Sequence, residues 1–315
     1  MNVVSKKAYI YIKNNNLKHS KLSYRAFGSY EKGKIVVIGR NLARTWSLIS
    51  KKIARPVSSI TLMHDPIAMG WKLGDRIVMA PNDLYEKGSE GTAEAFYIGS
   101  FGSNNTINLV DKNGQQATTS KIYFAETRYY NREAYALVQA EVINLSRNIL
   151  ITGDDFVHVA GQSHPPMSDD DFDKEQSDHC AAYPRANRQQ CTLGLHVIAR
   201  DPGAVLSLQY VRIEKCGQRG VLGKYCTHLH LVQSCPDCKI IGNAYEFGHQ
   251  RGTVVHGTHL ATVAHNVYND IRGTDIYIED GNEMYNQILY NVGICPWPLR
   301  TGEKRGCTVP GNKFK

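Results

Sequence analysis

The sequence predicts an all-β chain that ends in a right-handed parallel β-helix, preceded by a small β-rich region. Helical periodicity is almost absent, whereas short runs rich in β-branched residues recur between turn residues, as in KIVVIG, NTINLV and THLHLV. In the later half these runs follow one another closely, without the Asn-Gly turns that mark antiparallel hairpins. This pattern favours a solenoid.

A repeat in the later half supports the solenoid. Asn243 and Asn266 lie 23 residues apart with Tyr245 and Tyr268 in step, and Asn291 begins another unit 25 residues on. Asparagine tolerates a left-handed backbone at a corner, and stacked amides form hydrogen bonds along a ladder. We therefore expect one coil to take about 23 residues, with an asparagine ladder at one corner.

Three regions are predicted along the chain. Residues 1–30 carry little pattern and form a poorly defined N-terminal segment, residues 31–140 form the β-rich region, and residues 141–315 form the β-helix. A polar, Pro-containing stretch over residues 161–191 interrupts the helix as a loop excursion. Its acidic run suits calcium in residue type but lacks the glycine and spacing of a known calcium loop, so a solvated loop is favoured for Asp169, Asp170, Asp171 and Asp173.

Composition limits the classes of partner and compartment. The chain of 315 residues has 42% apolar content, enough for a buried core, and no apolar run approaches the length of a membrane-spanning helix. Lys6 and Lys7 stand where a signal peptide would have its apolar run, so no export signal is visible. The net charge of +8 suits an acidic glycan. Nucleic acid is not expected as a partner, because no signature of a nucleic-acid-binding fold occurs.

The cysteines indicate an oxidising compartment. All eight lie at or beyond Cys180, in the region assigned to the β-helix. Spacing predicts two disulfides, Cys180–Cys191 and Cys295–Cys307. The CPDC motif also matches half of a zinc site, but no second CxxC supplies the other two ligands. Two sequons, which begin at Asn104 and Asn144, agree with an extracellular glycoprotein.

A row of polar residues is predicted across successive coils. His228 and His230 are two residues apart on one strand and therefore face the same side. Shifting the sequence by one coil places His230 beside His256, and a further shift places His256 beside Glu279. Equivalent positions on neighbouring parallel strands are about 4.8 Å apart. The three residues should form one row.

Such a row has three possible roles. It could supply the acid and base for glycosidic cleavage, it could bind a divalent ion such as calcium through His230, His256 and Glu279, or its members could be buried and satisfy one another. Burying so many polar groups without a use is costly, and His228 and Asp280 lie next to the row. A functional site is therefore the favoured interpretation.

Four further side chains lie at predicted coil turns. They could line a groove for an acidic sugar chain, although charges at exposed turns usually only face solvent. The four are Arg219, Lys224, His249 and Arg251.

Several motifs together resemble one family. YVRIEKCGQRGVLGKYCTHLHLV, GTVVHGTH and IYIEDGNEMYNQILYNVG are similar, in this order, to the β-helix of the family that contains the cell-surface hyaluronidase, the cell-migration-inducing hyaluronan-binding protein and fibrocystin-L. AEVINLSRNILITG resembles the segment that opens that helix, and TWSLI, SSITL and MGWKLGDRIVMAP resemble the end of the eight-glycine domain. The resemblance spans roughly residues 30–295.

The resemblance implies an extracellular or cell-surface protein that acts on hyaluronan or another acidic glycan. Depolymerisation by a hyaluronidase-like glycosidase is the favoured activity, and the alternative is a non-catalytic glycan-binding or structural module of fibrocystin-L type. The family's motif positions fall on the residues of the predicted row, His228, His230, His256, Glu279 and Asp280. The chain departs from the family motif at Cys226 and Thr227, where the family has proline, and at Leu229, where it has an aromatic residue.

Overall fold

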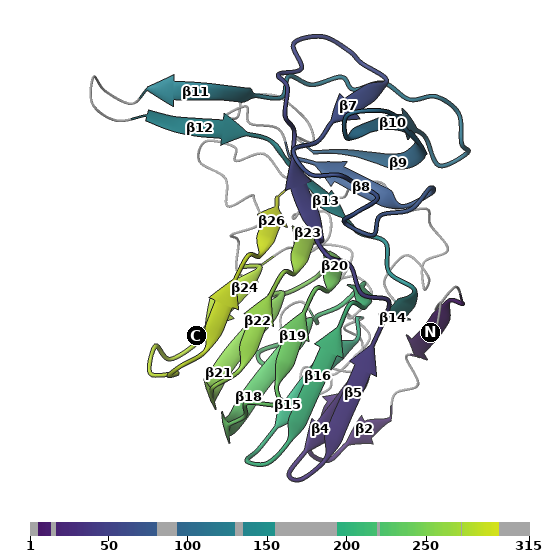
Figure 1. The fold of residues 1–315 in the computed structure, drawn as a ribbon. Helices are drawn as coiled ribbons and strands as arrows, with labels where there is room; N and C mark the ends of the chain where they lie inside the picture. The colour runs from purple at the N-terminus through teal and green to yellow at the C-terminus, as the bar shows by residue number, and fades with distance from the viewer. Residues whose placement is uncertain are drawn as a thin grey trace, which may run out of the picture.

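The structure is a computed structural model, and it describes residues 6–13, 17–80, 93–129, 135–154, 194–218, 221–271 and 273–295. Every regular element in these ranges is a β-strand. The strands form a parallel β-helix and an antiparallel sheet that lies along one side of the stacked coils (Figure 1). The predicted all-β class and β-helix are both confirmed.

Three parallel sheets form the helix, and each complete coil gives one strand to each sheet. Sheet I contains, in spatial order, β1 (Ala8–Ile12), β14 (Ile149–Gly153), β17 (Arg212–Glu214), β20 (Ala244–Gly248), β23 (Val267–Ile271) and β26 (Val292–Ile294). Sheet II contains β4 (Ala26–Tyr30), β15 (His196–Arg200), β18 (Thr227–Ser234), β21 (Thr253–His259) and β24 (Ile276–Ile278). Sheet III contains β5 (Lys34–Ile38), β16 (Val205–Gln209), β19 (Lys239–Ile241), β22 (Thr262–Ala264) and β25 (Gln287–Leu289).

Apolar side chains fill the space between the three sheets. Ile240 and Val263 face each other on neighbouring coils and are fully buried, and burial of such a side chain is worth roughly 1.5–3 kcal/mol. Tyr245 lies opposite Tyr268, as the repeat predicts, and their rings stack with centroids 4.7 Å apart. Their hydroxyl groups form hydrogen bonds with the hydroxyls of Thr227 and Thr253, so the buried phenols are satisfied.

The predicted asparagine ladder is present. The Oδ1 atoms of Asn243, Asn266 and Asn291 accept the backbone N–H groups of Val211, Asn243 and Asn266, at 3.0, 2.9 and 2.9 Å. The left-handed residue, however, is the one before each asparagine: φ is +66° at Gly242, +56° at His265 and +54° at Tyr290. Asparagine is needed for its side-chain amide, which bridges coils, and not for its backbone.

The antiparallel sheet is inserted in the first coil. Its strands, in spatial order, are β6 (Trp46–Leu48), β13 (Glu141–Asn144), β8 (Arg76–Met79), β9 (Glu94–Phe101), β10 (Thr106–Val110) and β7 (Ser59–Thr61). Two small hairpins complete the described strands, β2 (Lys18–His19) with β3 (Ser23–Tyr24) and β11 (Ala125–Tyr129) with β12 (Tyr135–Gln139). The sheet has a core of its own, which includes Ile77, Ile98 and Ile107.

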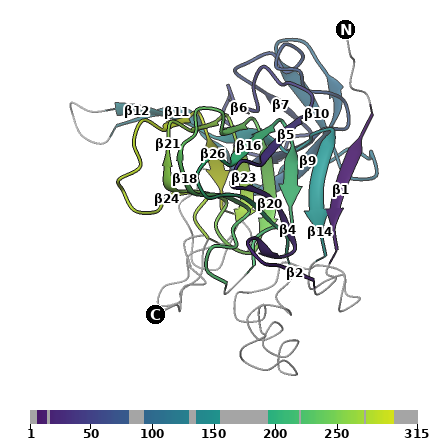
Figure 2. The same ribbon diagram turned by 90° about the horizontal axis from the view of Figure 1, so that it is seen from below.

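The predicted boundaries of the first two regions differ from the structure. β4 and β5 pair in parallel with β15 and β16, and β1 pairs with β14, next to which it lies in Figure 2. The first coil is therefore β4, β5 and β14, with the antiparallel sheet between its second and third strands. The sequence hides this coil because the insertion separates its strands well beyond the repeat length.

A buried ion network joins the two bodies. Glu246 on β20 is fully buried; its Oε1 accepts a hydrogen bond from Arg76 Nη1 on β8, and its Oε2 lies 2.6 Å from Arg212 Nη2 on β17. A buried carboxylate requires such partners, because its desolvation would otherwise cost several kcal/mol. The network therefore fixes the antiparallel sheet against the helix.

Candidate active site: three histidines and two carboxylates

Sheet II holds the predicted polar row. His230 on β18 lies opposite His256 on β21, and Glu279 directly follows β24, where its N–H donates to Val255 O at 3.0 Å. His228 lies on the same face, with its ring centroid 4.8 Å from that of His230. The predicted alignment is therefore confirmed, while the chemical roles of these residues stay predictions.

A bulge follows the two facing histidines. The register between β18 and β21 shifts after His230, and Leu231 and Gly257 have φ angles of +54° and +52°. At residue 257 this positive φ would strain any side chain, and a Cβ atom would also lie 2.7 Å from Leu231 Cδ2, so glycine is favoured there. Gly257 N donates to Glu283 Oε1 at 3.0 Å. Bulges often re-aim side chains next to functional sites, which is the arrangement here.

The tautomer of His228 follows from a single contact. Its Nδ1 lies 3.0 Å from Gly223 O, and because a carbonyl only accepts, Nδ1 carries the proton. Burial, helped by the neighbouring His230, holds the pKa of His228 well below its usual value, so the ring is neutral. Its Nε2 therefore presents a lone pair; this atom is buried, has no hydrogen-bond partner among the described residues, and lies 3.8 Å from Glu279 Oε2.

His256 lies between a carboxylate on one side of its ring and a second histidine on the other. Its Nε2 lies 3.1 Å from Asp280 Oδ2, and its Nδ1 lies 3.1 Å from His230 Nδ1 and 3.6 Å from Glu279 Oε2. The carboxylate of Asp280 accepts the Nε2 proton, which in the neutral ring leaves a lone pair on Nδ1. Burial and the adjacent His256 lower the pKa of His230 to about 4, so His230 is also neutral at pH 7.

Two unsatisfied acceptors thus face one another. They are His228 Nε2 and Glu279 Oε2, which are buried, 3.8 Å apart and without a hydrogen-bond partner among the described residues, whereas His256 Nδ1, 3.6 Å from Glu279 Oε2, is in hydrogen-bond contact with His230 Nδ1. Acceptors that face one another without a proton between them repel, unless a cation lies among them. One ring nitrogen from each of the three histidines lies within 4.8 Å of the others, which is close enough to share an ion.

The donor set discriminates between metals. Imidazole nitrogen with one carboxylate oxygen suits zinc and similar transition-metal ions, whereas calcium takes oxygen ligands almost alone. Calcium, the ion predicted from the sequence, therefore fits this cluster less well than a zinc-like ion does.

Arg251 and His249 are buried and not exposed at their turns, and their part in a substrate groove stays a prediction. The guanidinium of Arg251 lies over the rings of Tyr225 and Tyr277, 5.2 and 3.9 Å from their centroids, and donates to Tyr225 OH. The Tyr225 ring in turn contacts His228. Arg251 therefore supports the wall behind the cluster, because neighbouring coils cover the turn on which it lies.

Of the other two predicted groove residues, the structure describes Lys224 but not Arg219. Lys224 is half-buried and its Nζ donates to Leu22 O at 3.3 Å; burial, together with nearby cations, lowers its pKa to about 8. Its ammonium group is thus already engaged with the protein. Arg219 lies outside the described residues.

A disulfide that sequence reasoning missed anchors the segment behind His228. Cys216 and Cys226 are bonded, and the segment between them carries Gly223, whose carbonyl sets the His228 tautomer. Cys226 stands where the family has proline, so the disulfide restrains the chain at that point in proline's place. The pairing was detectable only as two cysteines ten residues apart with a glycine-rich segment between them.

The second described disulfide corrects the zinc interpretation of the CPDC motif. Cys235 and Cys238 are bonded to each other, so neither thiolate is available to a metal. Cys295 is disulfide-bonded too. The predicted pairs Cys180–Cys191 and Cys295–Cys307 each include residues outside the described part of the chain, as does the whole acidic run from Asp169 to Asp173.

One of the two sequons is not accessible. Asn144 is fully buried and its Nδ2 donates to Asp75 Oδ2 at 2.9 Å, so the prediction of a glycan there is wrong for the folded protein. Asn104 is exposed. The sequence could not show which face of its strand the Asn144 side chain takes.

The comparisons with known proteins agree with this architecture. Residues 192–309 match the family model described as CEMIP beta-helix. This part of the chain, which holds most of the helix, is thus similar to the CEMIP beta-helix. A G8 domain-containing protein of Dictyostelium discoideum is 25% identical over 264 residues, 82% of this chain and 18% of the relative. Human fibrocystin-L is 29% identical over 268 residues, 79% of this chain and 6% of that protein.

The resemblance seen in the motifs is thus confirmed for the CEMIP and fibrocystin-L family. The chain spans less than a fifth of the length of these relatives. Within the described residues, no helix is long and apolar enough to cross a membrane.

Proposed function

We propose that this chain is an extracellular or cell-surface protein that cleaves glycosidic bonds in an acidic polysaccharide of hyaluronan type, at the histidine cluster of its β-helix. The observation that carries the proposal is the pair of buried acceptors without partners, His228 Nε2 and Glu279 Oε2, which lie beside His256 at a partly open site. The similarity of residues 192–309 to the CEMIP beta-helix supports the substrate class, and the net charge of +8 would attract a polyanion.

A divalent cation fits this chemistry, and His228, His256 and Glu279 would hold it. It would supply Lewis-acid stabilisation of the negative charge that develops during bond cleavage. Asp280, through its contact with His256 Nε2, would orient that ligand in the manner of a carboxylate behind a metal-bound histidine.

His230 has the properties of a proton acceptor. It is half-buried, so a substrate can reach it from solvent, and it is neutral at pH 7 because its pKa lies at about 4. Cleavage of a glycosidic bond requires a group that takes a proton from the attacking water and a group that protonates the leaving oxygen. His230 is suited to the first of these tasks.

The test is to incubate the purified chain with hyaluronan of defined size, after dialysis against chelator and after return of zinc, manganese or calcium. Shortening of the polymer that chelator abolishes and zinc restores is the expected result. If chain length stays constant under every condition in protein shown to be folded, cleavage is excluded.

His256→Ala separates cleavage from binding. Loss of cleavage with retained hyaluronan binding supports an enzyme. A wild-type protein that binds hyaluronan and never cleaves it is instead a glycan-binding module. Lys34→Gln is the control, because Lys34 is an exposed residue of sheet III that pairs only with the exposed Asp237.

A further inference from the structure

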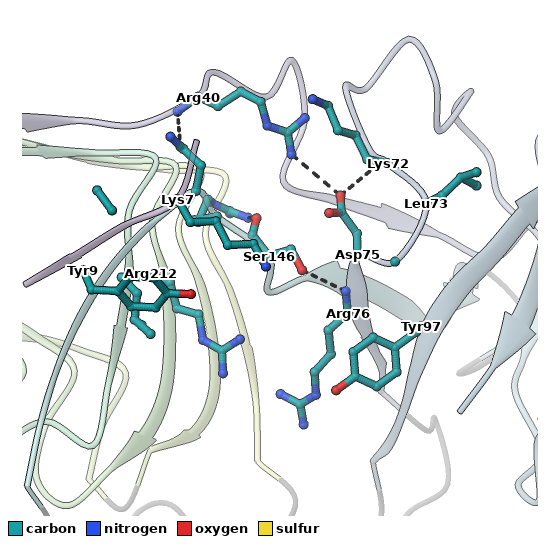
Figure 3. A pocket seen from close by; sticks show the side chains of 15 residues that line it. Lys7, Tyr9, Arg40, Lys72, Leu73, Asp75, Arg76, Tyr97, Ser146 and Arg212 are labelled. Atoms are coloured by element: carbon teal, nitrogen blue, oxygen red, sulfur yellow. Dashed lines mark hydrogen bonds and ion pairs between the residues drawn. The ribbon is translucent and has the colours of Figure 1, made fainter. Parts of the chain in front are cut away.

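A second polar site lies where the antiparallel sheet meets the first coil. It is a cavity of about 420 Å³, within the size range of ligand pockets (Figure 3). None of its lining residues belongs to the histidine cluster. Its basic lining residues come from segments far apart in the sequence, namely Lys7, Arg40, Lys72, Arg76, Arg147 and Arg212.

The carboxylates near the cavity are already engaged. Asp75, the one acidic lining residue, accepts hydrogen bonds at Oδ2 from Lys72 N and Asn144 Nδ2, both at 2.9 Å, and lies 3.8 Å from Arg40 Nη2. Figure 3 shows the guanidinium of Arg40 directed at this carboxylate, whereas Lys72 contacts it through its main-chain N–H. The carboxylates of Glu214 and Glu246 are held by Arg76 and Arg212. Six cations thus face three carboxylates, and the cavity keeps an excess of positive charge.

Arg147 adds a buried charge to the wall of the cavity. Its Nε donates to Gly242 O at 2.8 Å, and its Nη1 donates to Asn144 O and Ser146 O at 2.9 and 2.7 Å. Its Nη2 is buried and has no hydrogen-bond partner among the described residues. Burial lowers the pKa of Arg147 to about 9, while the nearby carboxylate of Asp75 acts in the opposite direction.

The rim of the cavity offers contacts for a larger ligand. Tyr9 on β1 is 65% exposed and lines the cavity, and Tyr97 on β9 lines it from the antiparallel sheet. Lys7 and Lys72 are exposed. Aromatic faces pack against the apolar faces of cyclic ligands, while ammonium groups attract their acidic substituents. The combination suits a charged sugar better than a bare inorganic ion.

We propose that this cavity binds an oxyanion group, a carboxylate or sulfate, of an acidic sugar chain, with Lys7 and Lys72 as donors at the rim and the charge of the arginines in the wall behind them. Ammonium groups bind such oxyanions through short charge-assisted hydrogen bonds. The ion network of Arg76, Glu246 and Arg212 holds the two walls together before any ligand arrives, which lowers the entropic cost of binding. The site is independent of the proposed cleavage chemistry, since it lies on other residues.

The test is isothermal titration of the full chain with hyaluronan oligosaccharides, chondroitin sulfate oligosaccharides and inorganic sulfate. The Lys7→Gln, Lys72→Gln double variant should lose about tenfold or more in affinity for the oligosaccharides, because each charge-assisted contact is worth roughly a factor of ten. The Lys34→Gln, Lys239→Gln variant, a charge-matched control that removes two exposed lysines of sheet III, should bind as the wild type does. Arg147→Gln should weaken binding further if it folds.

Comparing the affinity for hyaluronan oligosaccharides, which carry only carboxylates, with that for chondroitin sulfate oligosaccharides shows which oxyanion the cavity prefers. Equal affinity of the double variant, the control and the wild type overturns the proposal. Binding of inorganic sulfate without binding of either sugar chain overturns the assignment to a glycan. The His256→Ala variant should bind at this cavity as tightly as the wild type does. A wild-type protein that binds at the cavity but cleaves no hyaluronan would refute the proposed function and leave this inference intact.

Discussion

At the scale of single residues, the histidine cluster depends on which ring nitrogen carries the proton. Gly223 O accepts from His228 Nδ1, and Asp280 lies beside His256 Nε2. Each contact is made on the far side of the ring, so that the lone pair is directed toward Glu279. The cation-binding character of the site thus comes from two neighbours that do not themselves reach the centre.

Asp280→Asn tests this orientation. An amide at residue 280 still fills the space, but its NH₂ group can donate a hydrogen bond to His256 Nε2. The imidazole would then carry its proton on Nδ1 and lose the lone pair there. We expect zinc affinity, measured by competition with a chromogenic chelator, to fall about 10- to 100-fold, as for other residues behind a metal ligand. Asp237→Asn, at an exposed carboxylate on the other side of sheet III, should leave it unchanged.

Asp275 makes a prediction about pH and stability. Burial raises its pKa to about 7 from an ordinary 3.8. The folded state therefore holds a proton that the unfolded state releases, and stability falls as pH rises from about 4 to about 7. The Asp275→Asn variant has no carboxyl group to titrate and does not lose stability in this way. The free energy of unfolding of the variant minus that of the wild type should therefore rise between pH 4 and pH 7 by a few kcal/mol, on the order of 1.4 kcal/mol per pH unit.

Urea unfolding at pH 5 and pH 8 measures the effect. A difference between variant and wild type that is the same at both pH values would show that Asp275 does not titrate between them. His196 and His228, whose buried rings have pKa values well below normal, act with the opposite sign and are common to both proteins, so they cancel in the comparison.

Some residue positions were predictable and others were not. A shift of one coil sufficed to align His230, His256 and Glu279, because parallel strands keep a constant register. The burial of His249 and Arg251 could not be seen, because it depends on side chains of neighbouring coils, such as Tyr277, that cover the turn. Local polarity alone predicted exposure, and packing between coils overrode it.

At the scale of elements, the asparagine ladder stabilises the corner of successive coils. Asn266 accepts from Asn243 N, while its own Nδ2 donates to Ile240 O at 2.7 Å and to Asn291 Oδ1 at 3.0 Å. All these groups are at or near the core, where water cannot replace the lost partners. The ladder was predictable from the sequence because the same residue type recurs at one coil's spacing.

Asn266→Ala should therefore lower the free energy of unfolding by about 2–5 kcal/mol, since a buried N–H and a buried carbonyl each lose a partner worth roughly 1–3 kcal/mol. Asn291→Ala, at the half-buried end of the ladder, should cost less because solvent can reach the exposed groups. Chemical denaturation of both variants gives the comparison. Equal costs at the two positions would argue against burial as the source of the effect.

The first coil was not predictable as an element. β4 and β5 precede the antiparallel sheet and β14 follows it, so no repeat of coil length connects them. The cavity of Figure 3 was hidden for the same reason, since Lys7, Lys72 and Arg147 meet only once that coil has closed around the insertion. Pattern within the sequence reveals neighbours at a fixed spacing, and an insertion removes that spacing.

At the scale of the whole molecule, Glu246 links two bodies that each have their own core. Arg76 comes from the antiparallel sheet, whereas Arg212 and Glu246 belong to the helix. The same three side chains stand beside the basic cavity, two of them in its wall. Loss of this network should therefore affect stability, the unfolding mechanism and oxyanion binding together.

Arg76→Met tests this link. The methionine replaces the bulk of the arginine but leaves the buried carboxylate of Glu246 with fewer partners, and breaking a buried pair of this kind costs about 3–5 kcal/mol. We expect the cooperative thermal transition of the wild type to separate into two, because the antiparallel sheet and the helix then unfold on their own. Differential scanning calorimetry resolves the transitions.

The matched control is Lys52→Met, which removes a lysine whose ammonium group lies 2.8 Å from Glu126 at a largely exposed site. An exposed pair contributes only about 0–1 kcal/mol, so this variant should keep a single transition near the wild-type temperature. The double variant Arg76→Met, Glu246→Gln should recover part of the lost stability, because the unpaired buried charge is gone. If it recovers none, the cost of Arg76→Met comes from packing and not from the isolated carboxylate.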